Sequence, residues 1–119
     1  MFPIVNRDTG NEMINRVWVV QEGKNDYSSA EEEYGEVHFI TEGELRNIPG
    51  SQQNIDVVSD IRKFRSEYIP GKDYIIPAGN PMVVALVTMS LGPGNHNFLK
   101  WDGRRASYIP FKLNPEILK

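Results

Sequence analysis

The chain of 119 residues contains no cysteine. This absence excludes disulfide bonds, thiolate metal sites, iron–sulfur clusters and a cysteine nucleophile. Histidine is also scarce, since only His38 and His96 occur, and neither has a second ligand at a spacing that forms a metal site. We therefore expect no metal and no other cofactor, and we expect stability to rest on packing of the core.

Long apolar runs are missing as well. The longest uncharged apolar stretch, residues 78–91, is too short to cross a bilayer and contains a Gly-Asn-Pro turn. Residues 1–15 are mixed and polar, so they lack the hydrophobic stretch of a secretory signal, and we expect them to be poorly ordered. The sequence thus predicts a cytoplasmic protein with no membrane partner.

The charge is unevenly distributed along the chain. Residues 1–59 hold four Lys and Arg against eleven Asp and Glu, whereas residues 60–119 hold nine against five, for a net charge of -3. If the two halves separate in space, the molecule has an acidic and a basic side. If they interleave, this polarity disappears.

The patterning predicts one α/β (α+β) domain over residues 1–119, with a mixed sheet of about five strands and two helices in the order β-β-α-β-α-β-β. The expected strands are residues 17–21, 36–40, 73–78, 97–101 and 107–113. The first two should form a hairpin around an acidic loop, residues 22–35. The last two should form a hairpin at Asp102–Gly103. The last strand should be an edge strand or should hold Pro110 at an outward-facing position.

Two helices of different character are expected. The first begins at Asn54 as its cap and ends before Pro70, and its apolar residues Val57, Ile61, Phe64 and Tyr68 fall on one stripe. The second, residues 82–91, has almost no polar side, so it should be buried all round or should meet a partner.

Catalytic motifs are absent from the sequence. No nucleophile elbow occurs, and the adjacent Glu31, Glu32 and Glu33 are typical of a solvated surface. His38 alternates with apolar residues as the exposed side of a strand does, and His96 follows a glycine-rich turn where we expect solvent. We assign no catalytic residue.

A candidate ligand site lies where the third strand meets the second helix. Free N–H groups at a helix start attract anions, and Gly79 and Asn80 occupy this junction. The junction lacks a phosphate-binding glycine fingerprint, however, and ordinary turn and capping chemistry accounts for the same residues.

Nucleic-acid binding is a second hypothesis for the basic half of the chain. Its candidate residues are Arg62, Lys63, Arg65, Trp101, Arg104 and Arg105. Cations can hold phosphates and an aromatic ring can stack on a base. The hypothesis predicts that Trp101 and the two turn arginines share a surface with Arg62 and Lys63. Alternatively, the tryptophan is a core residue and the cations merely solvate the surface.

Several segments of the C-terminal half resemble a known group of proteins. These are residues 73–81 with the apolar helix that follows, residues 98–102 and residues 108–110, with a weaker likeness at residues 17–21. Together they are similar to short uncharacterised proteins of tailed bacteriophages, including phages from marine and environmental samples. The resemblance implies a phage-encoded accessory protein that acts inside an infected bacterium, and it supplies no catalytic motif.

Our interpretation is a non-enzymatic accessory protein that binds a host protein, a phage protein or a copy of itself through the apolar helix or a sheet edge. Single-stranded nucleic-acid binding and a ligand or enzyme site at Gly79–Pro81 remain as alternatives.

Overall fold

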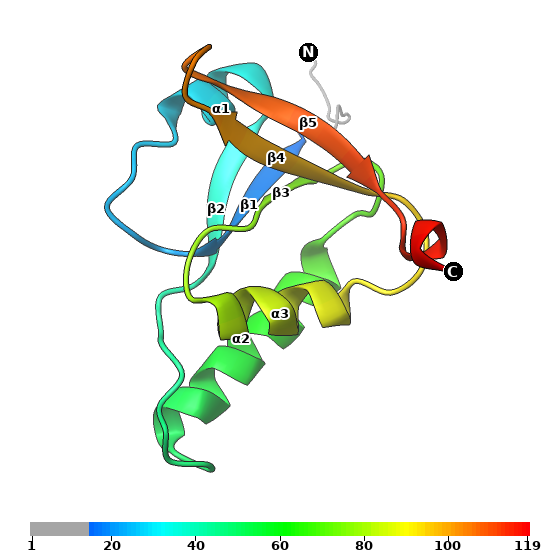
Figure 1. Cartoon of the computed structure of the whole chain (residues 1–119). Coiled ribbons are helices and arrows are strands. Elements are labelled where there is room, and N and C mark those ends of the chain that lie inside the picture. Colours follow the sequence, from blue (N-terminus) through cyan, green and yellow to red (C-terminus); the bar gives the residue numbers. More distant parts are fainter. Residues whose placement is uncertain (1–14) are drawn as a thin grey trace, which may run out of the picture.

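The computed structural model describes residues 15–119. The expectation of poor order for residues 1–15 therefore lies, except for Asn15, outside the described residues. The elements are β1 (Arg16–Gln21), α1 (Ser28–Glu33), β2 (Glu36–Thr41), α2 (Gln52–Glu67), β3 (Tyr74–Ile76), α3 (Pro81–Ser90), β4 (His96–Asp102), β5 (Ser107–Leu113) and a 3-10 helix, η1 (Pro115–Leu118) (Figure 1). The five strands form a mixed sheet, which confirms the expected α+β class.

The order of strands in the sheet is β2-β1-β3-β4-β5. The first four strands run parallel to their neighbours, and only β5 is antiparallel, to β4. The predicted hairpin of β1 and β2 is therefore wrong, because these strands are parallel. Residues 22–35, predicted as an acidic loop, include α1, which supplies the crossover that parallel strands require. Ala30 is the one residue of α1 that is buried. A single alanine beside three glutamates gives no apolar pattern from which this helix could have been predicted.

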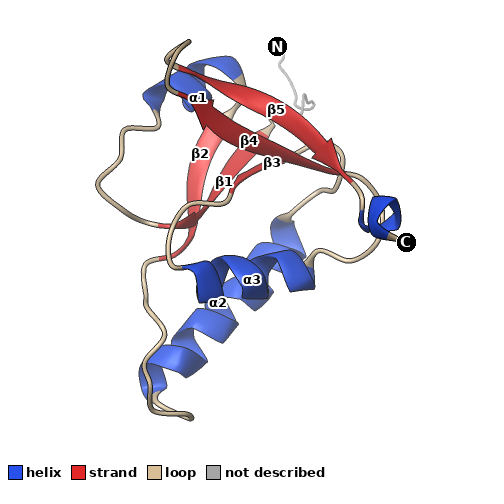
Figure 2. Ribbon diagram, viewed as in Figure 1, coloured by secondary structure: helices blue, strands red, loops and turns tan. Residues whose placement is uncertain are grey.

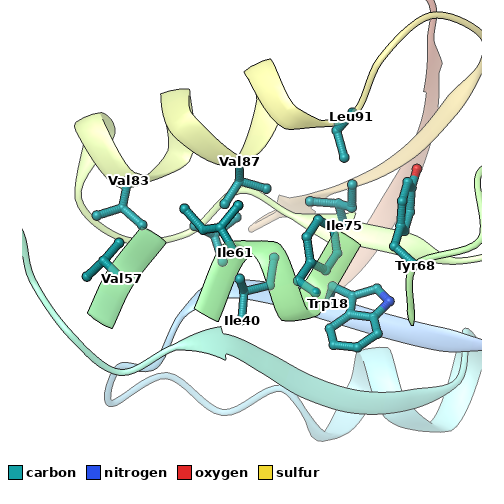
Figure 3. Close-up of a cluster of buried hydrophobic side chains, with 11 residues drawn as sticks. Trp18, Ile40, Val57, Ile61, Tyr68, Ile75, Val83, Val87 and Leu91 are labelled. Atoms are coloured by element: carbon teal, nitrogen blue, oxygen red, sulfur yellow. The ribbon is translucent and has the colours of Figure 1, made fainter. Parts of the chain in front are cut away.

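Helices lie on both faces of the sheet (Figure 2). On one face, α2 and α3 pack over a cluster that includes Trp18, Ile61, Ile75 and Val87 (Figure 3). On the other face, α1 and Tyr27 pack over a smaller cluster that includes Leu99. The two clusters use alternate residues of β1, as the two-residue period of a strand dictates. We call these the double-helix face and the single-helix face.

The stripe predicted for α2 is confirmed, because Val57, Ile61, Phe64 and the C-cap Tyr68 are all buried. The cap is different from the prediction. Ser51 is the N-cap and its hydroxyl accepts from the Asn54 N–H, while the Asn54 side chain bonds the backbone of the preceding loop at Arg46. Serine and asparagine both favour the N-cap position, so the sequence alone did not decide between Ser51 and Asn54.

The helix α3 is less enclosed than its composition predicted. Asn80 caps it and Pro81 takes its first turn, as expected, but only Val83 and Val87 within it are buried. Met82 and Met89 are largely exposed, the latter by 80%. The helix covers the sheet with one side only, so of the two expectations burial all round is wrong and contact with a partner stays a prediction.

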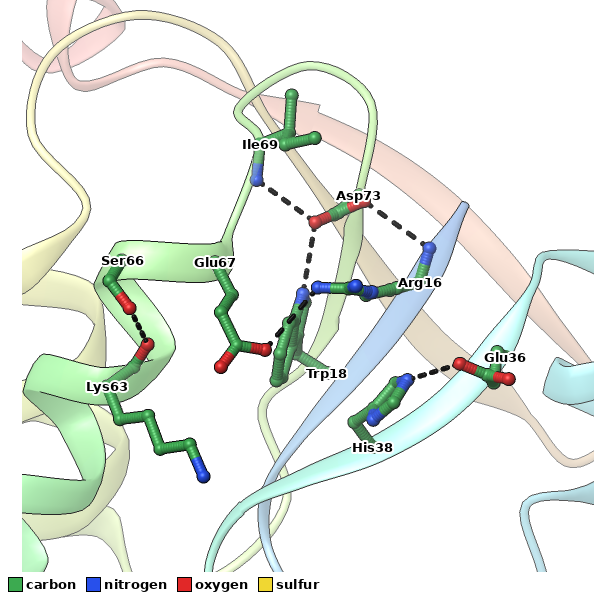
Figure 4. A network of polar contacts seen from close by, with 9 residues as sticks. All are labelled: Arg16, Trp18, Glu36, His38, Lys63, Ser66, Glu67, Ile69 and Asp73. Atoms are coloured by element: carbon green, nitrogen blue, oxygen red, sulfur yellow. Dashed lines mark hydrogen bonds and ion pairs between the residues drawn. The ribbon is translucent and has the colours of Figure 1, made fainter. Parts of the chain in front are cut away.

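A buried carboxylate joins the ends of three elements on the double-helix face (Figure 4). Asp73 accepts from the backbone N–H of Arg16, at 3.3 Å, and of Ile69, at 3.0 Å, and from the Trp18 indole N–H at 3.1 Å. Three donors satisfy a group that would otherwise be costly to bury. Asp73 therefore ties the end of α2 to the starts of β1 and β3.

His96, expected in solvent, is 3% exposed. Its Nε2 lies 3.0 Å from the Gly92 carbonyl oxygen and its Nδ1 lies 2.6 Å from the Tyr68 hydroxyl. Because a carbonyl only accepts, Nε2 carries the proton and Nδ1 accepts from Tyr68. Burial raises the pKa of Tyr68 to about 12; nearby Asp73 adds to this shift and Arg65 opposes it.

The hairpin of β4 and β5 is confirmed, and so is the edge position of β5 with its Pro110. Its turn is longer than the predicted tight turn, since residues 103–106 connect the strands and Ala106 carries the positive φ, at 51°. The Asp102 carboxylate stabilises this turn by accepting from the N–H groups of Arg104 and Arg105.

Candidate functional site: a groove beside the β4–β5 hairpin

An open, mostly apolar groove of about 720 Å³ lies along the β4–β5 hairpin. We call it the hairpin groove. Its lining residues are Asn25, Asp26, Tyr27, Ile76, Pro77, Ala78, Phe98, Leu99, Lys100, Trp101, Tyr108, Phe111 and Leu113.

The groove exists because neighbouring strands differ in length. β3 has only three residues and its pairing with β4 ends at Ile75 and Phe98, whereas β4 and β5 stay paired to Asp102 and Ser107. The far part of the hairpin therefore runs past β3 with no strand beside it. The loop before α1 approaches this margin with Tyr27 but leaves it open.

Aromatic side chains form much of the groove wall. Trp101 lies opposite Tyr108 in the register, with ring centroids 5.1 Å apart in an edge-to-face arrangement. Tyr108 is buried, and the Tyr34 hydroxyl donates to its carbonyl oxygen at 2.9 Å. Burial raises the pKa of the Tyr108 phenol, and Tyr27 and Asp26 add to the shift. This anchored ring holds Trp101 in place while Trp101 itself stays 48% exposed.

Further along the hairpin, a second aromatic pair lines the groove from the other face of the strands, because Phe98 and Trp101 are three residues apart on β4. Phe98 lies opposite Phe111, so both rings share one face of the sheet. Phe98 packs against the core, but Phe111 is 46% exposed. Trp101 and Phe111 are therefore the two large rings of the hairpin that stay exposed, one on each face of the strands.

Charges of opposite sign flank one end of the groove. Lys100, Arg104 and Arg105 are exposed at the turn, and Glu31, Glu32 and Glu33 are exposed on α1. α1 packs against β5, so these groups are neighbours (Figure 1). Arg105 pairs with Asp102 at 3.6 Å, and across residues 15–119 no ion pair joins the turn to α1. Here acidic and basic parts of the chain interleave rather than occupy separate sides.

The predicted ligand residues Gly79 and Asn80 lie just beyond the groove, which reaches Pro77 and Ala78. The Asn80 N–H donates to the Gln21 side-chain oxygen at 2.6 Å, and the Asn80 side chain accepts from the Met82 N–H at 2.8 Å. Gly79 has a φ of 126°, and an added Cβ would come within 2.5 Å of Gln21. The N–H groups of Asn80 and Met82, which an anion would need as donors, thus already bond to the side chains of Gln21 and Asn80.

The six residues predicted to bind nucleic acid form two separate groups. Trp101, Arg104 and Arg105 lie at the hairpin, beside α1. The other three lie on α2, under the opposite face of the sheet (Figure 1). Within the α2 group, Lys63 borders a polar hollow with Glu22, Glu42, Asp60 and Glu67 among its walls, and Arg65 lies over the Tyr68 ring. The structure does not bring the two groups to one surface.

Sequence reasoning did not identify the groove itself. Tyr27 and Leu113, far apart in the chain, both line it, and no local pattern connects them. One usable signal existed: Ile109, Phe111 and Leu113 alternate along an edge strand, which indicates an apolar row on its less protected side.

Within the described residues, no group of three or more His, Asp or Glu side chains is placed to hold a metal ion. The same residues contain no helix with the length and apolar character needed to span a membrane.

A protein-family model described as "Phage Pam3 gp32-like protein" matches residues 15–115. Comparison with curated proteins and with solved structures gave no match.

Proposed function

Because the chain belongs to the Phage Pam3 gp32-like protein family, we propose that it is a phage accessory protein that binds another protein in the hairpin groove, without catalysis, inside an infected bacterium. The observation that carries this proposal is the groove with its exposed Trp101 and Phe111. Large exposed aromatic residues that line an apolar depression are typical anchors of protein interfaces.

The β5 edge of the sheet is less suited to a partner, although a sheet edge was one of the contact surfaces predicted from the sequence. A partner strand at this edge would have to pair with the outer side of β5. Pro110 has no N–H to offer, and the Tyr108 carbonyl already accepts from Tyr34. The hairpin groove is therefore better suited to bind a partner than the β5 edge.

Site-specific photo-crosslinking tests the proposal. Benzoylphenylalanine is placed at Trp101 or at Phe111, and in a control at Ile55, which is exposed on α2 away from the groove. In infected cells we expect a discrete adduct with one protein from both groove positions and none from Ile55. Identical labelling at all three positions, or no adduct at the groove, would overturn the proposal.

Single-stranded nucleic-acid binding is the second candidate function, favoured by one observation. Lys100, Trp101, Arg104 and Arg105 share a smaller hollow of about 480 Å³ at the hairpin turn. This places cations beside an exposed ring, the combination that holds phosphates and stacks bases.

Fluorescence anisotropy with labelled dT12 tests this candidate. Binding should fall steeply with salt and should be lost in Arg104→Ala/Arg105→Ala, while Arg62→Ala/Lys63→Ala, on the remote α2, should bind as the wild type does. No binding at low salt, or equal loss in both variants, would remove it.

A further inference from the structure

We propose that the outer edge of β2 is a second protein-binding surface, which takes an extended peptide segment of alternating basic and apolar residues as a sixth strand of the sheet. This edge is independent of the proposed function, because β2 and the β4–β5 hairpin lie at opposite ends of the strand order (Figure 1).

The outer edge of β2 presents backbone groups with no partner strand. The Glu36 N–H donates to the Asn15 carbonyl oxygen at 3.1 Å, on the side of β1, and the parallel register continues from there to Phe39. Because the peptide groups of alternate residues in a strand point to opposite edges, those of Val37 and Phe39 point away from β1. Within residues 15–119, no strand pairs with this edge and no loop backbone bonds to either residue. The described part of the chain thus leaves the N–H and C=O groups of both residues open to a further strand.

β2 also lacks features that commonly protect the edge of a sheet. Its six residues include no proline, glycine or lysine. At the other end of the sheet, β5 contains Pro110 and Lys112, and its Tyr108 carbonyl oxygen already accepts from Tyr34. An edge without such features pairs readily with an extended segment of another chain. The open backbone therefore indicates a strand as the partner, and the side chains beside β2 select its sequence.

Three carboxylates are held around Thr41, the last residue of β2. The Thr41 carbonyl oxygen accepts from the Glu22 N–H at 3.0 Å, and the Thr41 hydroxyl donates to the Asp60 carboxylate at 2.8 Å. Glu42 follows Thr41 directly in the chain. Among residues 15–119, none of these three carboxylates takes part in an ion pair. The end of β2 therefore carries negative charge that a basic partner can neutralise.

The same carboxylates line a polar hollow of about 430 Å³ that runs along β2 from His38 to Thr41. Lys63 is the one lysine or arginine in its wall, and the Glu67 in its wall pairs with Arg16 at 3.4 Å. Since no three acidic or histidine side chains of the described residues are placed to hold one metal ion, the carboxylates suit cations that are spaced apart. Lysine or arginine side chains along an added strand supply such cations.

The two faces of β2 select different residues of the partner. The His38 ring lies 5.2 Å from Trp18 on the double-helix face, whereas the Phe39 ring, 40% exposed, lies 6.0 Å from Tyr27 on the single-helix face. Side chains of an added strand alternate in the same way, so one set enters the hollow and the other covers Phe39. The partner therefore alternates basic and apolar residues. A second copy of this chain, paired through β2, would instead bring acidic side chains together.

Fluorescence anisotropy of the full chain with a labelled peptide, KVKVKVK, tests the proposal. We expect binding that weakens as salt is raised, because the ion pairs with the lysines are screened. The control peptide KKKKVVV has the same composition without the alternation and should bind about 10-fold more weakly, because it cannot place lysines and valines on opposite faces of a strand.

Hydrogen exchange measured by NMR identifies the edge. In the complex the amides of Val37 and Phe39 should exchange at least about 10-fold more slowly, because they donate to the peptide. The amides of Glu36 and His38 face β1 and should change little. Phe39→Pro removes one outward N–H without removing a bond to β1, so it should weaken binding by about 10-fold while thermal melting shows a retained fold.

Charge reversal tests the choice of partner. Glu22→Lys/Glu42→Lys should weaken binding of KVKVKVK by about 10-fold or more, because lysines then face lysines. The matched control, Glu32→Lys/Glu116→Lys, changes the net charge equally but lies outside the hollow, and it should bind as the wild type does. Trp101→Ala, in the hairpin groove, should also leave binding unchanged.

Several outcomes would overturn the proposal. These are no binding at low salt, equal affinity for the two peptides, amides of Val37 and Phe39 that stay unprotected in the complex, and equal loss of binding in the two charge variants. Loss of binding in Trp101→Ala would place the peptide in the hairpin groove and would overturn the proposal as well.

Discussion

The two faces of the sheet are covered very differently. On the double-helix face, α2 and α3 seal a cluster in which Phe64 and Val87 have almost no contact with solvent. On the single-helix face, the six-residue α1 covers the first strands. The hairpin groove stays open where β4 and β5 run past the end of β3. The first face has the features of a stabilising core, and the second combines a small core with an exposed aromatic surface. We therefore expect stability and binding to respond to different substitutions.

The largest expected effect on stability comes from the double-helix face. Phe64→Ala should lower the free energy of unfolding by about 4 kcal/mol, because it removes a buried ring and leaves a cavity. Urea denaturation measures this value. The matched control is Phe111→Ala, a ring of equal size in the groove, which should cost less than about 1 kcal/mol. Similar losses for the two variants would contradict the contrast between the sealed core and the open groove.

The next effect concerns two carboxylates in unlike surroundings. Asp73→Ala should destabilise the fold by about 3 kcal/mol, since it leaves buried N–H groups of Trp18 and Ile69 without an acceptor. Asp102→Ala, at the exposed hairpin turn, also loses two N–H contacts but should cost only about 1 kcal/mol, because water replaces them. Thermal melting of both variants provides the comparison.

Alkaline pH should lower the stability of the fold through Tyr68, which lies in the core of the double-helix face. The folded-state pKa of Tyr68 is about 12 against 10.0 for the free side chain, so the folded protein holds this proton more tightly than the unfolded chain. The stabilisation is complete below pH 10 and is lost as pH rises toward 12, by roughly 2 kcal/mol. Unfolding measured between pH 9 and 12 should show a smaller decline in Tyr68→Phe. An unchanged decline would assign it to other groups, such as Tyr34 and Tyr108, whose pKa values burial also raises.

The smallest expected effect on stability lies in the groove. Trp101→Ala should change the free energy of unfolding by no more than about 0.5 kcal/mol, because half of this side chain is already in water. The same substitution should abolish the crosslink formed from Phe111. A large loss of stability would show that Trp101 belongs to the core, which was the alternative interpretation of its sequence.

Local signals predicted much of the fold. The apolar stripe of α2, the cap and first turn of α3 at Asn80 and Pro81, and the β4–β5 hairpin with its edge proline were all readable, because each depends on residues close together in the chain. Predictions failed where a distant partner decided the outcome. His96 is buried because Tyr68 and Gly92 accommodate it, and β2 is parallel to β1 because α1 forms where acidic residues suggested a loop.

The candidate site shows the same division. The sequence identified Trp101, Arg104 and Arg105 as a basic and aromatic segment, and it excluded cysteine chemistry outright. The nucleic-acid hypothesis also placed these residues on one surface with Arg62 and Lys63, but α2 carries both of those under the other face of the sheet. Only the tertiary structure set a short β3 beside a longer β4 and brought Tyr27 to the margin between them. Composition and periodicity determine which side chains can be buried, whereas pairing of distant strands decides which of them remain uncovered, because a groove depends on where neighbouring elements end.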